Sequence, residues 1–386
     1  MVQTETNSNG LLTGVGIEPR AYQRRIVDRV VAMLTGPFTD DRNQRREEVG
    51  SVLIESPTGS GKTIMGLAVA RALQQQCGYT VAWVAMRKNL LAQVSRENTG
   101  KGFDVELKTV SMFSRKPPQA DLLVCDECQH DATPSGAAIH SAVRPTKVLG
   151  LSATPWRSDR ASLMFETNVR DAGIHNLIQD GFLSPYRHYT IPAYSPAAIA
   201  KLYASDPDRW GKSLVFFLRE VDCEECRRRL AACGIRAETV SGHSDRERQL
   251  DWFAHGRLDV LLSMGVLTEG FDCPELRTVF IRPAGSRGCV IQMAGRVLRR
   301  HADSPLKQVV QCCDTRYPFT RTATAAEQYV WAEGAWRTLT INRHLDKICC
   351  RSLQQLAGTT VTLPAMLVER QRRPGWTNRS HHFDEV

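Results

Sequence analysis

The chain has 386 residues, which at roughly 150 residues per domain indicates two or three domains. Hydrophobic residues make up 42% and charged residues 24%, and this balance excludes wholesale disorder, a collagen and a coiled-coil rod. No apolar run approaches the ~20 residues of a membrane span, and Met1–Gly10 is polar, so we expect a cytoplasmic protein without a membrane partner. The net charge of +9 suits a polyanionic partner such as nucleic acid.

The first half of the chain predicts an α/β domain. Residues 1–15 are rich in Thr, Asn and Gly, so we expect a flexible N-terminus before this domain, which spans residues 16–184. From about residue 50, short β-branched runs alternate with helical patterns, the rhythm of a parallel sheet wrapped by helices. The expected elements are strands at Val49–Glu55, Thr80–Ala85, Asp121–Cys125 and Lys147–Leu151, and a helix over Lys62–Gln76.

The same rhythm returns in the second half and predicts a second α/β domain over residues 185–318. Residues 185–208 contain several prolines, and we expect them to form a connector at its start. Residues 319–386 predict an extension, with a helix over residues 323–357 and a basic tail. The expected strands are Ser213–Leu218, Ala237–Val240, Asp259–Ser263, Thr278–Ile281 and Gln308–Gln311.

A candidate phosphate loop lies between a predicted strand and a predicted helix. Residues 56–63 read Ser-Pro-Thr-Gly-Ser-Gly-Lys-Thr. Glycines let backbone N–H groups turn inward around a phosphate, Lys62 would reach the β- and γ-phosphates, and the Thr63 hydroxyl would hold Mg²⁺. The alternative interpretation is an ordinary Gly- and Ser-rich turn, which the strand–loop–helix context disfavours.

A second acidic site ends the predicted strand that begins at Asp121. Asp126 would hold Mg²⁺ from the side opposite Thr63, and Glu127 would orient and deprotonate an attacking water. The alternative is an acidic pair at an ordinary strand end. The upstream phosphate loop makes that alternative weaker.

Two cysteines, Cys125 and Cys128, flank these carboxylates in a C-x-x-C pattern. We do not interpret them as a metal pair, because no second such pattern follows at zinc-finger spacing. Cys223 and Cys226 share one face of a predicted helix and are expected in the core. A four-cysteine metal site assembled across the fold stays open as an alternative.

Further motifs occur in a fixed order along the chain: Arg20–Gln23, Gly150–Arg157, Val266–Pro274 and Gln292–Arg299. Together with the phosphate loop and the sequence Asp126-Glu127-Cys128-Gln129, they resemble the motifs of superfamily 2 helicases of the DEAD/DEAH type. The resemblance covers residues 18–315. It is closest to the DNA-acting branch that includes RadD, UvsW and the motors of type I restriction enzymes.

This resemblance implies two tandem RecA-like domains with an ATP site in the cleft between them, and ATP and Mg²⁺ as cofactors. Gln23 would read the adenine edge, and Asp272 would contact ATP across the cleft. The residues that would be catalytic are Lys62, Asp126, Glu127, Arg296 and Arg299. The residues that would bind the nucleotide are Arg20, Gln23, Thr58, Gly59, Ser60, Gly61, Lys62, Thr63, Gly270, Asp272 and Gln292.

The resemblance also assigns the metal, the arginines and the coupling residues. Thr63 and Asp126 would hold the metal. Arg296 and Arg299 would be arginine fingers, and their spacing places both on one face of a predicted helix. The residues that would couple the ATP site to nucleic acid are Gln129, Ser152 and Thr154.

By family position, a nucleic-acid groove would use cations and hydroxyls at strand ends, which suit phosphate contacts. The residues in question are Arg87, Lys88, Thr109, Ser111, Ser241, Gly242 and Thr268. Ordinary loop chemistry is the alternative for each of them. Trp331, Trp336 and His344, in the predicted extension, are expected to pack against the second domain rather than to stack on bases.

The resemblance therefore implies a nucleic-acid-dependent ATPase, expected to be an ATP-dependent DNA helicase or translocase acting on single-stranded, branched or forked DNA. One alternative is an RNA helicase of the same fold. Another is a motor or switch subunit of a larger repair, replication or defence assembly.

Overall fold

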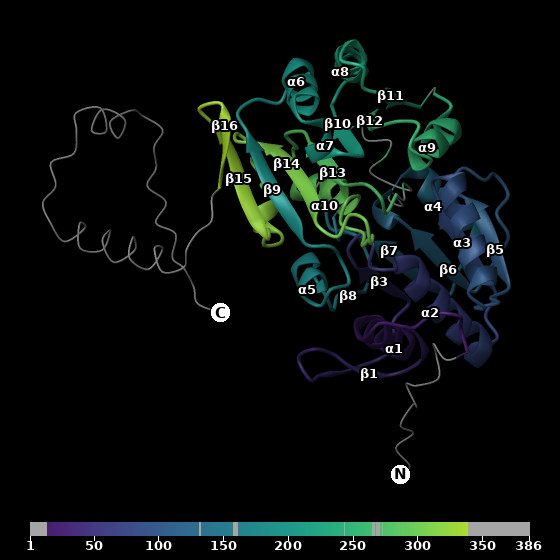
Figure 1. Ribbon diagram of the computed structural model, residues 1–386. Helices are drawn as coiled ribbons and strands as arrows, with labels where there is room; N and C mark the ends of the chain where they lie inside the picture. Colours follow the sequence, from purple (N-terminus) through teal and green to yellow (C-terminus); the bar gives the residue numbers. More distant parts are fainter. Residues whose placement is uncertain are drawn as a thin grey trace, which may run out of the picture. The chain divides into compact units, whose positions relative to one another are not determined.

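The computed structural model describes residues 14–338, apart from residues 131–132, 157–160, 243, 265–266, 268–270 and 272. Two sheets, each accompanied by helices, make up most of this part of the chain (Figure 1). We call residues 14–183 the N-terminal lobe and residues 184–338 the C-terminal lobe. A small antiparallel pair, β1 (Phe38–Thr39) and β2 (Arg45–Arg46), belongs to the N-terminal lobe.

The sheet of the N-terminal lobe is parallel throughout its described residues, with the strand order β5-β4-β6-β7-β3-β8. Its strands are β3 (Ser51–Glu55), β4 (Val81–Ala85), β5 (Leu107–Ser111), β6 (Leu122–Asp126), β7 (Lys147–Ser152) and β8 (Thr167–Val169). Its helices are α1 (Ala21–Thr35), α2 (Lys62–Cys77), α3 (Lys88–Gly100), α4 (Pro134–Val143) and α5 (Ile174–Gln179), with a 3₁₀ turn at η1 (Cys128–His130). The central strands β4 and β6 are buried along their whole length, as apolar runs in a parallel sheet predict.

The sheet of the C-terminal lobe has the order β11-β12-β10-β13-β14-β9-β15-β16, and every described pairing except β15–β16 is parallel. Its strands are β9 (Tyr186–Ile191), β10 (Ser213–Phe216), β11 (Ala237–Val240), β12 (Val260–Ser263), β13 (Thr278–Ile281), β14 (Lys307–Cys312), β15 (Glu327–Ala332) and β16 (Ala335–Thr338). Its helices are α6 (Pro196–Ser205), α7 (Pro207–Trp210), α8 (Glu220–Ala232), α9 (Arg246–Ala254) and α10 (Arg287–Gly295), with a 3₁₀ turn at η3 (Phe319–Arg321).

The strands and the helix predicted from hydrophobic patterning are confirmed, with only small shifts at their ends. Cys223 and Cys226 are buried on α8, as expected. None of the helices in the described part of the chain combines the length and the apolar content needed to cross a membrane.

The predicted helix over residues 323–357 is wrong where the structure describes it, because β15 and β16 form a hairpin there. Glu333 and Gly334 both have positive φ, 52° and 75°, as a two-residue hairpin turn requires. The cross-strand pair Trp331–Trp336 then packs edge to face. Trp336 also packs against Tyr189 of β9, so the expectation of packing on the second domain is confirmed for Trp336. Residues 339–357 and His344 lie outside the described residues.

The predicted connector over residues 185–208 is also wrong, because these residues form β9, α6 and the start of α7. β9 pairs with both β14 and β15 inside the sheet. Two of the four prolines in residues 185–208 mark helix starts: Pro196 and Pro207 are the first residues of α6 and α7. Ser195 and Asp206 cap these helices.

Candidate active site

The predicted phosphate loop follows β3 and opens α2. Gly59 and Gly61 have φ angles of 83° and 84°, a conformation that favours glycine, and Lys62 is the first helical residue and only 9% exposed. Gly66 lets α2 lie close to the sheet, since a Cβ there would approach the Trp83 ring to 2.7 Å. The close packing of α2 fixes the position from which the loop departs.

Side chains behind the loop hold its shape. The Tyr22 hydroxyl donates to the Ser60 carbonyl oxygen at 2.6 Å, and Gln23 Nε2 donates to the same oxygen at 2.9 Å. The Ser56 hydroxyl lies 2.7 Å from the Ser60 hydroxyl, so Ser56 adds a side-chain hydrogen bond within the loop. Gln23 Oε1 accepts from the Arg20 backbone N–H at 3.0 Å. Both ends of the Gln23 amide are therefore engaged within the protein, and its reading of adenine stays a prediction.

The two predicted carboxylates lie at the buried end of β6. Burial first, and then the charge of Glu127, raise the pKa of Asp126 to about 7, while the Lys62 ammonium opposes this rise. Glu127 has a φ of 54°, an uncommon value for a residue with a side chain, which directs the chain sharply out of the strand. The site thus holds Lys62 and an aspartate whose charged form is disfavoured by burial and by the neighbouring Glu127.

A hydrogen-bonded chain connects Glu127 to the end of β7. Gln129 Nε2 donates to Glu127 Oε2 at 3.1 Å, and the Ser152 hydroxyl lies 2.7 Å from Gln129 Oε1. The same hydroxyl lies 2.8 Å from the Thr154 carbonyl oxygen and accepts from the Thr154 backbone N–H at 3.2 Å. Gln129, Ser152 and Thr154 are all buried. The amide of Gln129 therefore links the Glu127 carboxylate to the Ser152 hydroxyl.

A cavity of about 370 Å³ lies where the loop, the carboxylates and the C-terminal lobe meet. This volume falls within the roughly 300–1,000 Å³ of small-molecule sites. Both lobes line it, with Thr58, Gly59, Gly61, Lys62, Thr63, Asp126 and Glu127 from one and Phe271, Pro274, Arg296 and Arg299 from the other. A second cavity, of about 530 Å³ and lined by residues such as Trp156 and Arg287, has no phosphate loop beside an acidic pair.

The two predicted arginine fingers reach this cavity from the C-terminal lobe. Arg296 is 4% exposed; its Nη1 donates to the Phe271 carbonyl oxygen at 3.0 Å and its Nη2 to Thr58 Oγ1 at 3.4 Å. Arg299 lies beside Gly59, with its Cγ 3.5 Å from where a Cβ of that glycine would stand. The prediction that both arginines lie on one face of a helix is wrong. α10 ends at Gly295, Arg296 is its C-cap, and Arg299 lies beyond the helix. Both side chains still line one cavity.

Some cavity residues were missed by sequence reasoning. The Phe182 ring lies under the Arg20 guanidinium, 4.9 Å from its Cζ, and both residues line the cavity. No local pattern marks Phe182, which follows a short helix near the domain boundary. Gln93, Glu97 and Lys101 also line it. Their spacing of four along and just beyond α3 is a signal that could have found them.

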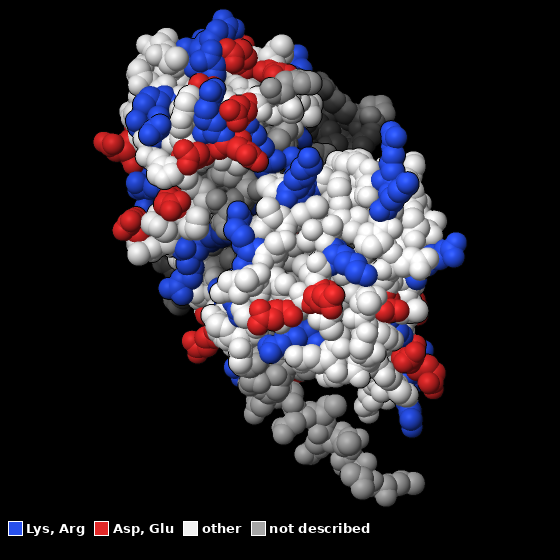
Figure 2. Space-filling view, turned by 90° about the vertical axis from the view of Figure 1, so that its right-hand side faces the viewer, with Lys and Arg blue, Asp and Glu red and all other residues white. Residues whose placement is uncertain are grey.

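Of the predicted groove residues that the structure describes, all but Thr109 lie at or just beyond the carboxyl ends of strands. Arg87 is the N-cap of α3 and Lys88 its first residue, directly after β4. Ser241 and Gly242 follow β11. Thr109 lies inside β5 rather than in a loop, and Ser111 is the last residue of that strand. Figure 2 shows Lys and Arg side chains on both lobes near their boundary.

Some predicted site residues either lie outside the described residues or do not line this cavity. Thr268, Gly270 and Asp272 lie outside the described residues. Gln292 is on α10 and does not line the cavity of about 370 Å³. Within residues 14–338 as described, no group of three or more His, Cys, Asp or Glu side chains is placed to hold a metal ion.

Two family models match the chain. The model described as type III restriction enzyme, res subunit, matches residues 16–104, and the helicase conserved C-terminal domain matches residues 195–301. These regions fall in the N-terminal and C-terminal lobes respectively. The fold is therefore that of two tandem RecA-like helicase domains, each a parallel sheet flanked by helices.

Curated relatives share about a quarter of their aligned residues with this chain. A 51.5 kDa protein of a Lactococcus phage (isolate 7-9) is 25% identical over 288 residues, covering 64% of this chain and 62% of the relative. A Saccharomyces cerevisiae protein assigned as ATP-dependent helicase IRC3 is 25% identical over 243 residues, covering 51% of this chain and 35% of the relative. The matches therefore span less than two thirds of these relatives.

Solved structures share the fold. A fragment assigned as an HsdR subunit of a type I restriction enzyme from Vibrio vulnificus YJ016 has a TM-score of 0.61 at 18% identity, covering 86% of this chain and 73% of that one. The type ISP restriction–modification enzyme LlaBIII bound to DNA scores 0.55 at 16% identity, covering 79% and 28%. S. cerevisiae Dbp5 bound to RNA and ADP BeF3 scores 0.56 at 15% identity, covering 85% and 93%.

The matched models show that this chain is similar to a restriction-enzyme subunit in its N-terminal lobe and to the conserved C-terminal domain of helicases in its C-terminal lobe.

Proposed function

We propose that this chain is an ATP-dependent DNA helicase or translocase of the branch that includes RadD, UvsW and type I restriction motors. The observation that carries the proposal is the shared cavity. One lobe contributes the phosphate loop with Lys62 and the carboxylates of Asp126 and Glu127, and the other contributes Arg296 and Arg299. A site divided in this way is complete only when the two lobes are together.

The chemistry that this arrangement supports is phosphoryl transfer to water. Such transfer depends mainly on positioning and on stabilising charge at the phosphoryl oxygens. Lys62 would hold the phosphates, Glu127 would take a proton from the attacking water, and Arg299 would stabilise the developing charge. Because Arg299 comes from the second lobe, hydrolysis would depend on closure of the lobes.

The same residues fit Mg²⁺. Thr63 offers a hydroxyl oxygen and Asp126 a carboxylate oxygen in one cavity, and hard divalent cations prefer oxygen ligands. The raised pKa of Asp126 also fits a carboxylate that lacks a sufficient counter-charge within the protein. A bound Mg²⁺ would supply charge neutralisation at the phosphates.

DNA is the proposed substrate rather than RNA. The restriction-enzyme neighbours, one of them solved with DNA, support this choice, while the Dbp5 neighbour with RNA supports the alternative. The net charge of +9 suits either polyanion. The groove residues Arg87, Lys88, Ser111, Ser241 and Gly242 would make contacts to phosphate that carry no sequence information.

The test is the rate of ATP hydrolysis with Mg²⁺ against a panel of single-stranded, duplex, forked and four-way DNA, and RNA of matched sequence. We expect at least one DNA to stimulate hydrolysis well above RNA. Stronger stimulation by RNA would overturn the DNA assignment, and no stimulation by any nucleic acid would overturn the function.

A second candidate is a motor subunit of a larger assembly. The structural similarity to a fragment assigned as an HsdR subunit of a type I restriction enzyme supports this candidate. A stoichiometric protein partner recovered with the tagged chain, combined with DNA-stimulated turnover only in its presence, would support this candidate over an independent enzyme.

A further inference from the structure

Phe113 is a large apolar side chain that the fold holds in solvent. It lies two residues beyond the end of β5 and is 61% exposed. The preceding residue, Met112, is 3% exposed and packs into the core with Val110 and Ala120. The loop is thus anchored by one side chain while the next points outward.

Hydrogen bonds fix the backbone that carries this ring. The Phe113 backbone N–H donates to Ser111 Oγ at 3.3 Å, and the Ser114 backbone N–H donates to the Ser111 carbonyl oxygen at 2.9 Å. The Met112 backbone N–H donates to the Ala85 carbonyl oxygen of β4 at 3.1 Å. An aromatic ring on a pre-ordered turn loses little further freedom when it is covered by a ligand.

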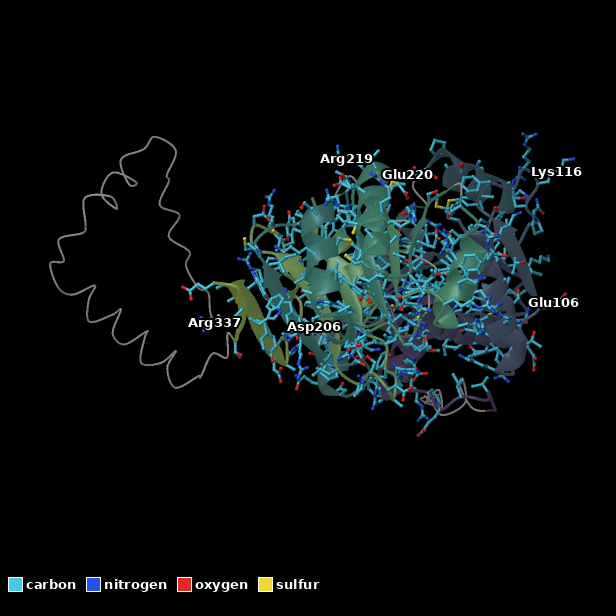
Figure 3. The ribbon with its side chains drawn as sticks, turned by 45° about the horizontal axis from the view of Figure 1, so that its top comes forward. Glu106, Lys116, Asp206, Arg219, Glu220 and Arg337 are labelled. Atoms are coloured by element: carbon cyan, nitrogen blue, oxygen red, sulfur yellow. The ribbon has the colours of Figure 1, made fainter. Side chains whose placement is uncertain are left out.

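The surroundings of Phe113 are cationic. Ala85 of β4 pairs in register with Ser111 of β5, so Arg87, two residues beyond Ala85, leaves the sheet beside this turn. The Nε of Arg87 is buried and lacks a hydrogen-bond acceptor within the described residues. Arg115 and Lys116 are exposed in the same loop as Phe113, and Lys116 projects away from the body of the protein (Figure 3).

The C-terminal lobe presents a further cation to this region. Burial, and then the charge of Arg87, lower the pKa of Arg246 at the start of α9, so two guanidinium groups from different lobes lie within electrostatic range. Like charges brought together at a lobe boundary favour an anion between them. The phosphates of nucleic acid supply such an anion, and an aromatic ring beside the phosphates can contact the bases.

We propose that Phe113 is a stacking platform for a nucleobase of a single nucleic-acid strand whose phosphates contact Arg87 and Lys116. This deepens the proposed function and depends on it. A ring can stack on any base, so the contact is tolerant of sequence but requires an unpaired base. Phe113 would therefore select single-stranded over duplex nucleic acid at the carboxyl ends of β4 and β5.

The test is binding of a fluorescein-labelled single-stranded oligonucleotide to the full chain by anisotropy, without nucleotide. Phe113→Ala should weaken binding of the single strand about tenfold or more, whereas Phe113→Trp should bind it about as tightly as wild type. Binding of a duplex should change little in either variant. Met164→Ala, which removes another exposed apolar side chain, is the matched control, since Met164 is 95% exposed. The melting temperature of each variant checks its folding.

Two further measurements separate stacking from other effects. An oligonucleotide with abasic sites should bind wild type and Phe113→Ala about equally, because the base is gone. The salt dependence of binding should be unchanged in Phe113→Ala and flatter in Arg87→Ala, since only the arginine neutralises a phosphate. Equal binding of intact strands by wild type and Phe113→Ala would overturn the inference alone. Absence of any nucleic-acid binding by wild type would overturn the proposed function as well.

Discussion

Asp126 lies at the buried end of β6 beside Glu127, and both conditions disfavour its charge. Its pKa is raised to about 7 in the folded protein, whereas an exposed aspartate titrates near 4. Between these values the folded protein binds more protons than the unfolded chain, so the stability that this group contributes at low pH is lost as the pH rises through about 7.

We therefore expect Asp126→Asn to raise the melting temperature of the ligand-free protein at pH 8 by a few degrees. The melting temperature of this variant should also depend less on pH between about 4 and 8 than that of the wild type. Hydrolysis should be lost in the same variant. Asp303→Asn is the control, because that carboxylate is 93% exposed. Identical pH dependence of melting in wild type and Asp126→Asn would show that Asp126 is not electrostatically strained.

Glu127→Gln tests the proposed base. The substitution keeps the side-chain shape and leaves Asp126 and Thr63 in place, so binding of ATP with Mg²⁺ should remain near wild type. Turnover should fall by about 10²–10⁴, the usual effect of losing a general base. The measurement is single-turnover hydrolysis together with nucleotide affinity. Retention of more than about a third of the wild-type rate would remove the assignment.

Sequence reasoning was most accurate for residues whose position depends on the local chain. Asp126 and Glu127 come directly after a predicted strand, Lys62 begins the helix predicted after the loop, and the structure brings all three to one cavity. Gln23 and Phe182 depend on contacts between distant segments. Gln23 bonds to Ser60, and Phe182 packs on Arg20 and Tyr22. No spacing along the sequence reports such contacts.

At the scale of elements, the same distinction explains the wrong predictions. Strands buried on both faces form continuous apolar runs and were found. The β15–β16 hairpin has intermediate burial along β15, and its strands are ordered by pairing with β9 and by the stacked rings of Tyr189 and Tyr329. β9 was not predicted as a strand because prolines lie on both sides of it in the sequence.

The chain of bonds between β6 and β7 gives a prediction at this scale. Ser152→Ala removes the hydroxyl beside Gln129 Oε1, and leaving a buried acceptor without its donor costs about 1–3 kcal/mol. We expect nucleic-acid stimulation of hydrolysis to fall about tenfold, with basal hydrolysis and ATP affinity less affected. ATP hydrolysis with and without a stimulating DNA measures this.

Ser213→Ala is the matched control for this prediction. Its hydroxyl is equally buried and donates to the Gly211 carbonyl oxygen, but it lies far along the chain from both motifs. It should lower the melting temperature without changing the stimulation ratio. If both variants lost stimulation to the same degree, loss of stability would explain the effect and the coupling role of Ser152 would be wrong.

At the scale of the whole molecule, the two lobes meet around the predicted phosphate loop. Thr58 accepts from Arg296 Nη2, and a Cβ on Gly295 would lie 2.8 Å from Thr58 Cβ. Arg296 also holds the Phe271 carbonyl oxygen, so its guanidinium joins the loop to the segment that lines the other side of the cavity. Arg299 lines the same cavity beside Gly59. The geometry thus gives the two arginines different tasks.

We expect Arg299→Ala to leave ATP affinity within about tenfold, because the phosphate loop on the other lobe supplies most ground-state contacts. Turnover should fall by about 10³ or more, since an arginine finger stabilises charge that develops only in the transition state. Arg296→Ala should lower both turnover and melting temperature, because it removes two bonds between buried groups. Arg257→Ala, an exposed arginine, is the control for charge alone. Single-turnover hydrolysis with and without DNA distinguishes the cases: if Arg299→Ala and Arg296→Ala both keep DNA-stimulated turnover near wild type, the lobes do not form a composite ATP site and nucleic acid cannot act by closing them.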